Sequence, residues 1–516
     1  MTVGPTLGTG LFVGTGQALA AGGPASLIIA YVFISAITYC VTTAVAEVST
    51  HSITRNGALL AHNYHYTSSH VGFAIAYLRW IGLSLLVPFE VTAGMVHLGL
   101  WEPSASLALR MGGMMAVIFF FNMLPEKYFR RSQTLFTGIK FSATIGLAII
   151  SFYLAIRASQ PGSRVRGFGY WAEPGPFAEF LLLGSLGRFL GLLFCIICST
   201  ISFVFLPELT VQVAEDRDSE PGNSIFRYTR NSNLVMFILY MLSTLTITLM
   251  APYDDPRLTH EGVGAGLSPY MVGLVDSKIR LLPAVGGGLI FLSSVASGRS
   301  FLNLASRMLS TMAETGHAPA LFMVRNRWNV PYMSVAISAG FTWLCFLCMA
   351  ISSSAVYNYL MFFITTIGYV SWICSLVAYL RFRRAAKKSE VLSLHRSFVQ
   401  AFGAYFALGA SVLLIMLNLA QVIVAPRHGL NPRNGISANV ALHLFGLLYG
   451  GHRLVVAVRK KAVRKKAARL DARAVEYRGG LDEDQPQDQV IEMEEVQAQR
   501  PEDERSTTPT PHAISS

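Results

Sequence analysis

Apolar runs about as long as a membrane span recur along the whole chain and are separated by short polar segments. A helix needs about 20 mostly apolar residues to cross the hydrocarbon core of a bilayer. The pattern therefore predicts an all-α polytopic membrane protein with about twelve spans, and eleven is the alternative because the fourth run is short. The predicted spans lie near residues 3–22, 25–48, 71–100, 110–125, 134–157, 187–213, 232–252, 281–312, 333–352, 355–380, 401–424 and 437–457.

Composition excludes most other classes of protein. Of the 516 residues, 52% are hydrophobic and only 14% are charged, and the mean hydropathy is +0.46. Soluble domains carry about 25% charged residues, so this chain cannot cover a large water-facing surface. A net charge of +12 would suit either nucleic acid or cytoplasmic lipid as a partner. In a chain built of apolar runs we favour membrane lipids and expect no nucleic acid.

Charge in the loops predicts the orientation of the spans. The loops after the even-numbered spans are the more basic ones, and basic loops stay on the cytoplasmic side. The C-terminus is therefore predicted to be cytoplasmic. We expect residues 1–460 to form the transmembrane domain and 461–516 a cytosolic tail, basic at first and then acidic and disordered. The basic stretch 453–473 is interpreted as a solvated flank of the last span or as a contact with anionic lipid.

Two predicted spans contain helix breakers at mid-depth. Span one has Gly8-Thr9-Gly10, and span six has Pro207 before Glu208. Open backbone is tolerated at this depth only where it is buried in protein or lines a cavity. These spans begin two consecutive five-span halves, a placement typical of inverted-repeat transporters that bind substrate between discontinuous helices. Half-helix ends offer N–H groups to a carboxylate and C=O groups to an ammonium, so a zwitterionic amino acid would fit both.

Each break also has an ordinary interpretation. Gly-x-Gly in an apolar helix commonly marks a close contact between helices, and a proline can simply kink a helix. A dinucleotide-binding loop fits poorly, because the spacing from Gly10 to Gly14 is one residue too long and no strand precedes it. The matching positions of the two breaks are what favour the transporter interpretation.

Several motifs follow one another in a recognisable order. They include Gly8-Thr9-Gly10-Leu11-Phe12-Val13-Gly14, Pro88-Phe89-Glu90-Val91-Thr92-Ala93, Ser268-Pro269-Tyr270 and Asn326-Arg327-Trp328-Asn329-Val330-Pro331-Tyr332. Together they resemble the signatures of fungal amino acid permeases, the yeast amino acid transporter family of the amino acid–polyamine–organocation superfamily. The resemblance covers roughly residues 4–460 and is specific for the family, not for a substrate.

The resemblance implies a LeuT-like five-plus-five inverted repeat with discontinuous spans one and six. It also implies proton-coupled import of an amino acid by alternating access, usually at the plasma membrane, with no cofactor. Residues 8–10 would meet the substrate carboxylate, and Glu90 and Glu208 match glutamates of the family in spans three and six. Span one is shortened on its N-terminal side, and Leu206-Pro207 stands where the family has Gly-Thr. These departures leave open a non-transporting amino acid sensor or a degenerate paralogue.

Charged side chains at membrane depth are costly and indicate either a function or a pairing. Glu90 is expected to contact the substrate amine or carry a proton, or else to pair with Arg299 or Lys140. Glu208 would gate the substrate or stabilise the start of a half-helix. Lys140 is a candidate proton carrier because related superfamily members have a lysine in span five. The alternative for Lys140 is snorkelling to the cytoplasmic face.

Three further residues complete the candidate binding set. Arg299 is unusual in span eight: facing a cavity it would favour an acidic side chain, and paired with Glu90 or Glu208 it would neutralise the site. Phe203 and Phe205 are candidates for an aromatic lid over the substrate, with lipid or core packing as the alternative.

The cysteines and histidines of the sequence do not indicate a metal site or a catalytic site. The pairs Cys195-x-x-Cys198 and Cys345-x-x-Cys348 lie among apolar neighbours that lack the supporting groups a metal site needs, so we expect buried thiols and no metal. The sequence contains no catalytic constellation, and we expect no enzyme. The histidines of the loop after span two are expected to be solvated: His62, His65 and His70.

Overall fold

The structure, a computed structural model, describes residues 9–50, 58–98, 106–157, 166–210, 223–259, 266–279, 281–388, 398–424 and 432–479. Within these ranges every regular element is a helix. In this described part of the chain, nine helices are long and apolar enough to cross a membrane, and two shorter apolar helices accompany them. One of the nine, Gly10–Thr50, is kinked at Gly23 and carries the first two predicted spans. The predicted class, a polytopic all-α membrane protein of about twelve spans, is confirmed.

Most helices begin and end within a few residues of the predicted spans. The helices Glu126–Arg157, Asn223–Thr248 and Ser353–Lys388 each extend well beyond the prediction at one end, and Pro432–Gly479 continues far past the predicted end at 457. The α-helices are α2 (Thr9–Phe12), α3 (Gly14–Thr50), α4 (Ala58–Tyr66), α5 (Ser69–Leu98), α6 (Leu107–Met123), α7 (Glu126–Arg157), α8 (Gly169–Ala172), α9 (Ser185–Thr200), α11 (Asn223–Thr248), α12 (Pro269–Asp276), α13 (Leu281–Glu314), α14 (Tyr332–Gly340), α15 (Ser353–Lys388), α16 (Phe398–Val424) and α17 (Pro432–Gly479). The 3₁₀ helices are η1 (Pro256–Leu258), η2 (Ala320–Met323) and η3 (Phe341–Met349).

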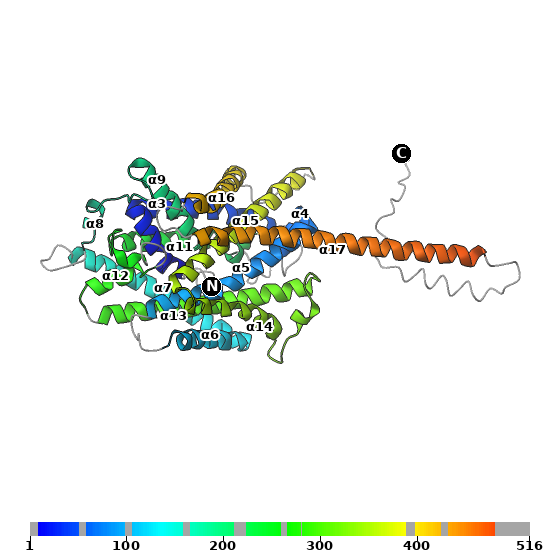
Figure 1. Ribbon diagram of the computed structural model, residues 1–516, viewed down its shortest axis with the longest axis horizontal. Coiled ribbons are helices and arrows are strands. Elements are labelled where there is room, and N and C mark those ends of the chain that lie inside the picture. Colours follow the sequence, from blue (N-terminus) through cyan, green and yellow to red (C-terminus); the bar gives the residue numbers. More distant parts are fainter. Residues whose placement is uncertain are drawn as a thin grey trace. The chain divides into compact units, whose positions relative to one another are not determined.

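Two packing relations place the candidate site. The long helix α3 packs most extensively against α9 and α11, whereas α5 packs against α13 and α15 (Figure 1). Spans one and six therefore lie side by side, although about 180 residues separate them in sequence. Spans three, eight and ten form the adjoining group.

The chain passes from span one to span two through a sharp change of direction at Gly23. Its φ of +81° is a conformation that L side chains rarely adopt, and Pro24 follows it. The freed backbone groups bind the segment after α8: Ala25 N–H donates to Pro176 O at 2.9 Å, and Ala178 N–H donates to Gly22 O at 3.0 Å. The backbone groups freed by the kink are thus satisfied by neighbouring protein.

By internal packing the chain divides into two units, Met1–His452 and Arg453–Ser516. The first contains α2 to α16 and the start of α17. In the second, the described side chains belong to the end of α17, are mostly exposed and include many basic residues. The predicted boundary near residue 460 and the cytosolic nature of the tail stay predictions.

The histidines after span two differ from one another. His65 is exposed, as expected, but His62 is 5% exposed, and His70 Nδ1 lies 2.9 Å from His452 Nδ1. Burial, helped by the charge of Arg79, lowers the pKa of His62 to about 3. The expectation of a fully solvated loop was therefore wrong for His62, because α4 packs on α5 and α15.

A clamp of opposite charges orders the segment between α11 and α13. Arg257 Nη2 lies 2.6 Å from Asp255 Oδ2 and 2.6 Å from Asp276 Oδ2, and Arg257 Nη1 donates to Asp276 Oδ1 at 2.9 Å. Burial alone would raise the pKa of Asp255, but hydrogen bonds and charge from Arg257 hold it below its usual value. The clamp therefore stabilises the fold above the ordinary pKa of an aspartate and weakens as the pH falls through the lowered value.

We expect Arg257→Ala to lower the apparent Tm of the purified protein by about one degree, because a part-exposed charge network contributes on the order of 1 kcal/mol. The matched control is Arg166→Ala, whose single pair with Glu173 is far more exposed; it should leave the Tm unchanged. The measurement is fluorescence-detected thermal unfolding in detergent at pH 7. Equal Tm values for the two variants would contradict the role of the clamp.

Candidate functional site

Span six is interrupted where the sequence led us to expect a break. Helix α9 ends at Thr200, residues 201–205 form turns, and a helical segment starts at Leu206. Pro207 is the second residue of that new segment, where its missing N–H costs no helical hydrogen bond. The proline thus marks the restart of the helix, and the break itself lies just before it.

Side chains from other spans satisfy the backbone of the turn. Tyr240 Oη donates to Ser202 O at 2.8 Å, and Trp372 Nε1 donates to Val204 O at 3.0 Å. Tyr31 Oη lies 3.2 Å from Ser202 Oγ. Spans two, seven and ten therefore hold the turn in place, which makes open backbone tolerable at this depth.

Span one approaches the turn through glycines and is interrupted after the predicted Gly8-Thr9-Gly10, because Thr9 and Gly10 are themselves helical, in α2. A turn at Val13 separates α2 from α3. A methyl group added at Gly10 would lie 3.0 Å from Ser202 Oγ and 3.2 Å from Ile201 Cγ2. Gly10 therefore allows close contact between the two interrupted spans. Gly8 lies outside the described residues, and nothing is described of the Thr9 side chain.

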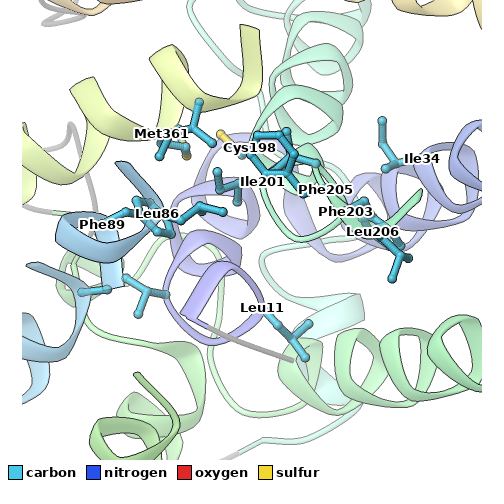
Figure 2. Close-up of a cluster of buried hydrophobic side chains, with 14 of the residues drawn as sticks. Leu11, Ile34, Leu86, Phe89, Cys198, Ile201, Phe203, Phe205, Leu206 and Met361 are labelled. Carbon is cyan, nitrogen blue, oxygen red and sulfur yellow. The ribbon is translucent and has the colours of Figure 1, made fainter. Parts of the chain in front are cut away.

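A cavity lies at this meeting point. Its volume is about 20 Å³, room for about one water molecule, so its walls are nearly closed on one another in this conformation. Span one contributes Gly10, span three Glu90, and span eight Phe301. The remaining lining is mostly apolar, and Figure 2 labels five of its side chains: Leu86, Phe89, Ile201, Phe205 and Leu206. The other lining residues come from spans three and six: Leu86, Phe89, Ile201, Ser202, Val204, Phe205, Leu206 and Leu209.

Glu90 is the charged residue of the cavity lining. It is 2% exposed, and its charge interacts with that of Lys140 on α7. Lys140 is 4% exposed and its Nζ donates to Ser297 Oγ on α13. Lys140 therefore does not snorkel to an interface; it is buried between α7 and α13, behind the cavity wall.

Arg299 is directed away from the cavity. Its guanidinium donates to Ser132 Oγ at 2.5 Å and to Gln133 Oε1, both on α7. Its Cζ also lies 4.4 Å from the ring centroid of Phe129 and 4.9 Å from that of Phe136. Among the described ion pairs it has neither Glu90 nor Glu208 as a partner, so uncharged oxygens and aromatic faces take the place of the expected carboxylate.

Glu208 also faces away from the cavity. Its Oε1 accepts a hydrogen bond from Ser371 Oγ at 2.6 Å and lies 3.7 Å from Arg79 Nη2. Sequence reasoning missed Arg79 altogether. The signal was available, because Arg79 is a charged residue inside predicted span three and the rule applied to Glu90 covers it equally.

The two candidate lid phenylalanines have different surroundings. Phe205 lines the cavity, whereas Phe203 packs against Tyr240 and Tyr31 with centroid distances of 4.5 and 5.7 Å. Only Phe205 of this pair is placed to contact a bound molecule. Phe203 instead belongs to the aromatic packing that supports the turn.

The cysteines of span six take part in packing. Cys195 and Cys198 are free and buried, and Cys195 Sγ donates to Ala18 O at 2.9 Å. Among the residues that the structure describes, no three histidine, cysteine or acidic side chains are grouped as metal ligands would be.

Comparison with known proteins decides the family. The model of the family described as "Amino acid permease" matches residues 1–465. The chain belongs to the amino acid permease family. Amino acid transport is the activity of this family, and its relatives are permeases, not enzymes.

Two curated permeases from fungi cover most of the chain. A probable proline-specific permease of Schizosaccharomyces pombe is 31% identical over 458 residues, 87% of this chain and 82% of that protein. A proline-specific permease of Emericella nidulans is 30% identical over 460 residues, 88% of this chain and 83% of that protein.

A solved structure shares the permease's fold. The manganese transporter of Eremococcus coleocola superposes with a TM-score of 0.53 at 14% identity and covers 89% of this chain and 94% of its own. At that identity the likeness concerns the fold alone, and it supports the predicted LeuT-like architecture of the permease.

We expect Gly368→Ala to disturb the turn. A methyl group at Gly368 on α15 would lie 1.9 Å from Val204 Cγ2, and a branched side chain cannot yield easily. Overpacking of this kind costs about 1–3 kcal/mol, and amino acid uptake should fall with stability. Thermal stability is measured on the purified variants, and amino acid uptake on cells that express them.

Gly409→Ala is the matched control, because it is also a helical glycine but has nothing within 4 Å of the added methyl group. The double variant Gly368→Ala, Val204→Ala should recover much of the loss. No recovery would show that contact with Val204 is not the cause.

Proposed function

We propose that this permease imports an amino acid with a neutral, apolar side chain, together with a proton, by alternating access. The observation that carries the proposal is the cavity at the meeting of spans one, three, six and eight, which has one carboxylate on a largely apolar wall. It lies beside the interrupted backbone of span six, where transporters of this architecture bind their substrates.

The lining favours a neutral substrate. Glu90 would pair with the α-ammonium, and the leucine and phenylalanine side chains would cover an apolar side chain. Among the described lining residues there is no lysine or arginine to match a second carboxylate, because Arg299 is directed elsewhere. The two relatives described above are proline-specific, so proline is the first substrate to test.

The same place supports proton coupling. Glu90 and Lys140 together carry no net charge when both are ionised, and the Ser297 hydroxyl joins Lys140 to α13. Gain or loss of a proton at Lys140 changes the charge beside Glu90 while Glu90 stays ionised to hold the substrate ammonium, so proton and substrate do not compete for one group. The protonated and deprotonated forms of the pair would then favour different arrangements of α5, α7 and α13. Coupling to a conformational change requires such a difference.

Location follows from the same proposal. An importer of external amino acids would act at the plasma membrane with its substrate site open in turn to each side. The basic loops would hold the C-terminus in the cytoplasm, next to anionic membrane lipids.

The direct test is uptake of labelled proline, leucine, aspartate and lysine by cells that lack their own amino acid permeases. We expect uptake of proline or leucine that rises with external acidity, and none of the two charged substrates. Glu90→Gln should raise the KM about ten- to hundredfold, the loss expected for one charge-assisted contact.

The matched control is Glu47→Gln. Glu47 is equally buried but accepts a hydrogen bond from Tyr379 Oη, outside the cavity, so its replacement should not change the KM. Binding of proline without uptake would favour a sensor, and neither binding nor uptake a degenerate copy; both results would contradict the proposal.

Coupling is tested separately with Lys140→Met. We expect this variant to lose uptake driven by a pH gradient while it keeps exchange of labelled for unlabelled substrate across proteoliposomes. Lys278→Met, outside the membrane helices, serves as the control. Gradient-driven uptake that survives in Lys140→Met would exclude Lys140 as the coupling group.

A further inference from the structure

A second charged pair lies buried outside the cavity. Arg79 on α5 is 1% exposed and Glu208 in span six is 7% exposed. The distance from Arg79 Nη2 to Glu208 Oε1 is 3.7 Å, too long for a direct hydrogen bond. Nothing in the proposed transport mechanism uses this pair.

One hydroxyl group of α15 bridges the two charges, and a second binds Arg79. Arg79 Nε donates to Ser371 Oγ at 2.7 Å, and that hydroxyl donates to Glu208 Oε1 at 2.6 Å. Arg79 Nη2 donates to Ser375 Oγ at 2.6 Å. The network therefore joins three elements that are distant in sequence: α5, the segment after the turn in span six, and α15.

The network is incompletely satisfied. Among the described residues, Arg79 Nη1 and Glu208 Oε2 are buried and have no hydrogen-bond partner. Buried charges with incomplete hydrogen bonding are stabilised less by their pairing than charges whose hydrogen bonds are all made. Such a contact joins the helices, but separating it takes less free energy than separating a fully hydrogen-bonded pair.

The Arg79–Glu208 network lies next to the cavity along the chain. Glu208 lies between Leu206 and Leu209, which line the cavity, on one short helical segment. Arg79 precedes Glu90 by three turns of α5, toward the end of the span that the loop charges predict to be cytoplasmic. The network therefore lies between the cavity and the predicted cytoplasmic side.

We propose that Arg79, Glu208, Ser371 and Ser375 form a latch that keeps the site closed toward the cytoplasm. While the latch is intact, the segment that begins at Leu206 is held on α5 and α15. When it breaks, that segment moves away and opens the cavity inward. These are positioning residues that do not touch the substrate, and their role rests on the transport function proposed above.

A purely structural role for the pair makes a different prediction. If the two groups only neutralise each other, removing one leaves a lone buried charge and harms folding, whereas removing both is harmless. A latch is lost in either case. The double variant Arg79→Gln, Glu208→Gln therefore separates the two roles.

The experiment measures access from the cytoplasmic side. A reporter variant, Leu209→Cys, is expressed full-length, and inside-out membrane vesicles are treated with a membrane-impermeant maleimide in the absence of substrate. Labelling above that of the parent, whose six cysteines remain, reports opening. Glu208→Gln and the double variant should each label about tenfold faster than the reporter alone, as a shift toward the inward-open state requires.

Wild-type labelling rates in the double variant would overturn the latch. Should the glutamine variants not fold, Ser371→Ala decides the question, since it removes the bridge but keeps both charges. Its control is Ser411→Ala, a buried serine that bonds only within its own helix to Ala407 O. Equal labelling of these two variants would also overturn the proposal.

Labelling needs no transported substrate, so the two proposals fail independently. An absence of uptake in the unmodified protein would count against the transport function and leave the labelling rates readable. Normal uptake with unchanged labelling would count against the latch alone.

Discussion

Peptide groups at membrane depth must find their hydrogen-bond partners inside the protein, and the turn at 201–205 concentrates that demand in one place. Its carbonyls accept hydrogen bonds from Tyr240 and Trp372, on spans seven and ten. Those helices must therefore stay close to span six. Span one has to approach as well, and Gly10 permits this because a side chain there would meet Ser202. The cavity lies where these requirements meet.

Buried charge is the second constraint, and the protein meets it in three ways. Glu90 and Lys140 lie close enough to offset each other beside the cavity. Arg79 and Glu208 are joined through the Ser371 hydroxyl. Arg299 has polar uncharged partners and aromatic faces. A group that titrates or separates during a cycle needs a partner that can release it, and the first two arrangements meet that need better than the third.

Sequence periodicity predicted the spans and the neighbourhood of both breaks, because apolar length and helix breakers are local properties. It placed the span-six break at Pro207, whereas the structure has the turn before the proline, which occupies the first turn of the following helix. The partners of buried charges were harder to predict. Glu90 and Glu208 looked equivalent in sequence, but helix rotation turns one toward the cavity and the other toward α15. Arg299 has its partners on α7, more than 160 residues away, and no local pattern contains that information.

The turn in span six is held through its backbone by residues of distant helices, and this separates two duties that most membrane helices combine. Ser202 and Val204 carry the anchoring carbonyls and also line the cavity. Ile201, Phe205 and Leu206 line it without taking part in those hydrogen bonds. Exchanging those three side chains leaves the anchoring hydrogen bonds in place. In the function proposed above, a lineage of such proteins can change its substrate by substitutions within a few neighbouring positions, without rebuilding its architecture.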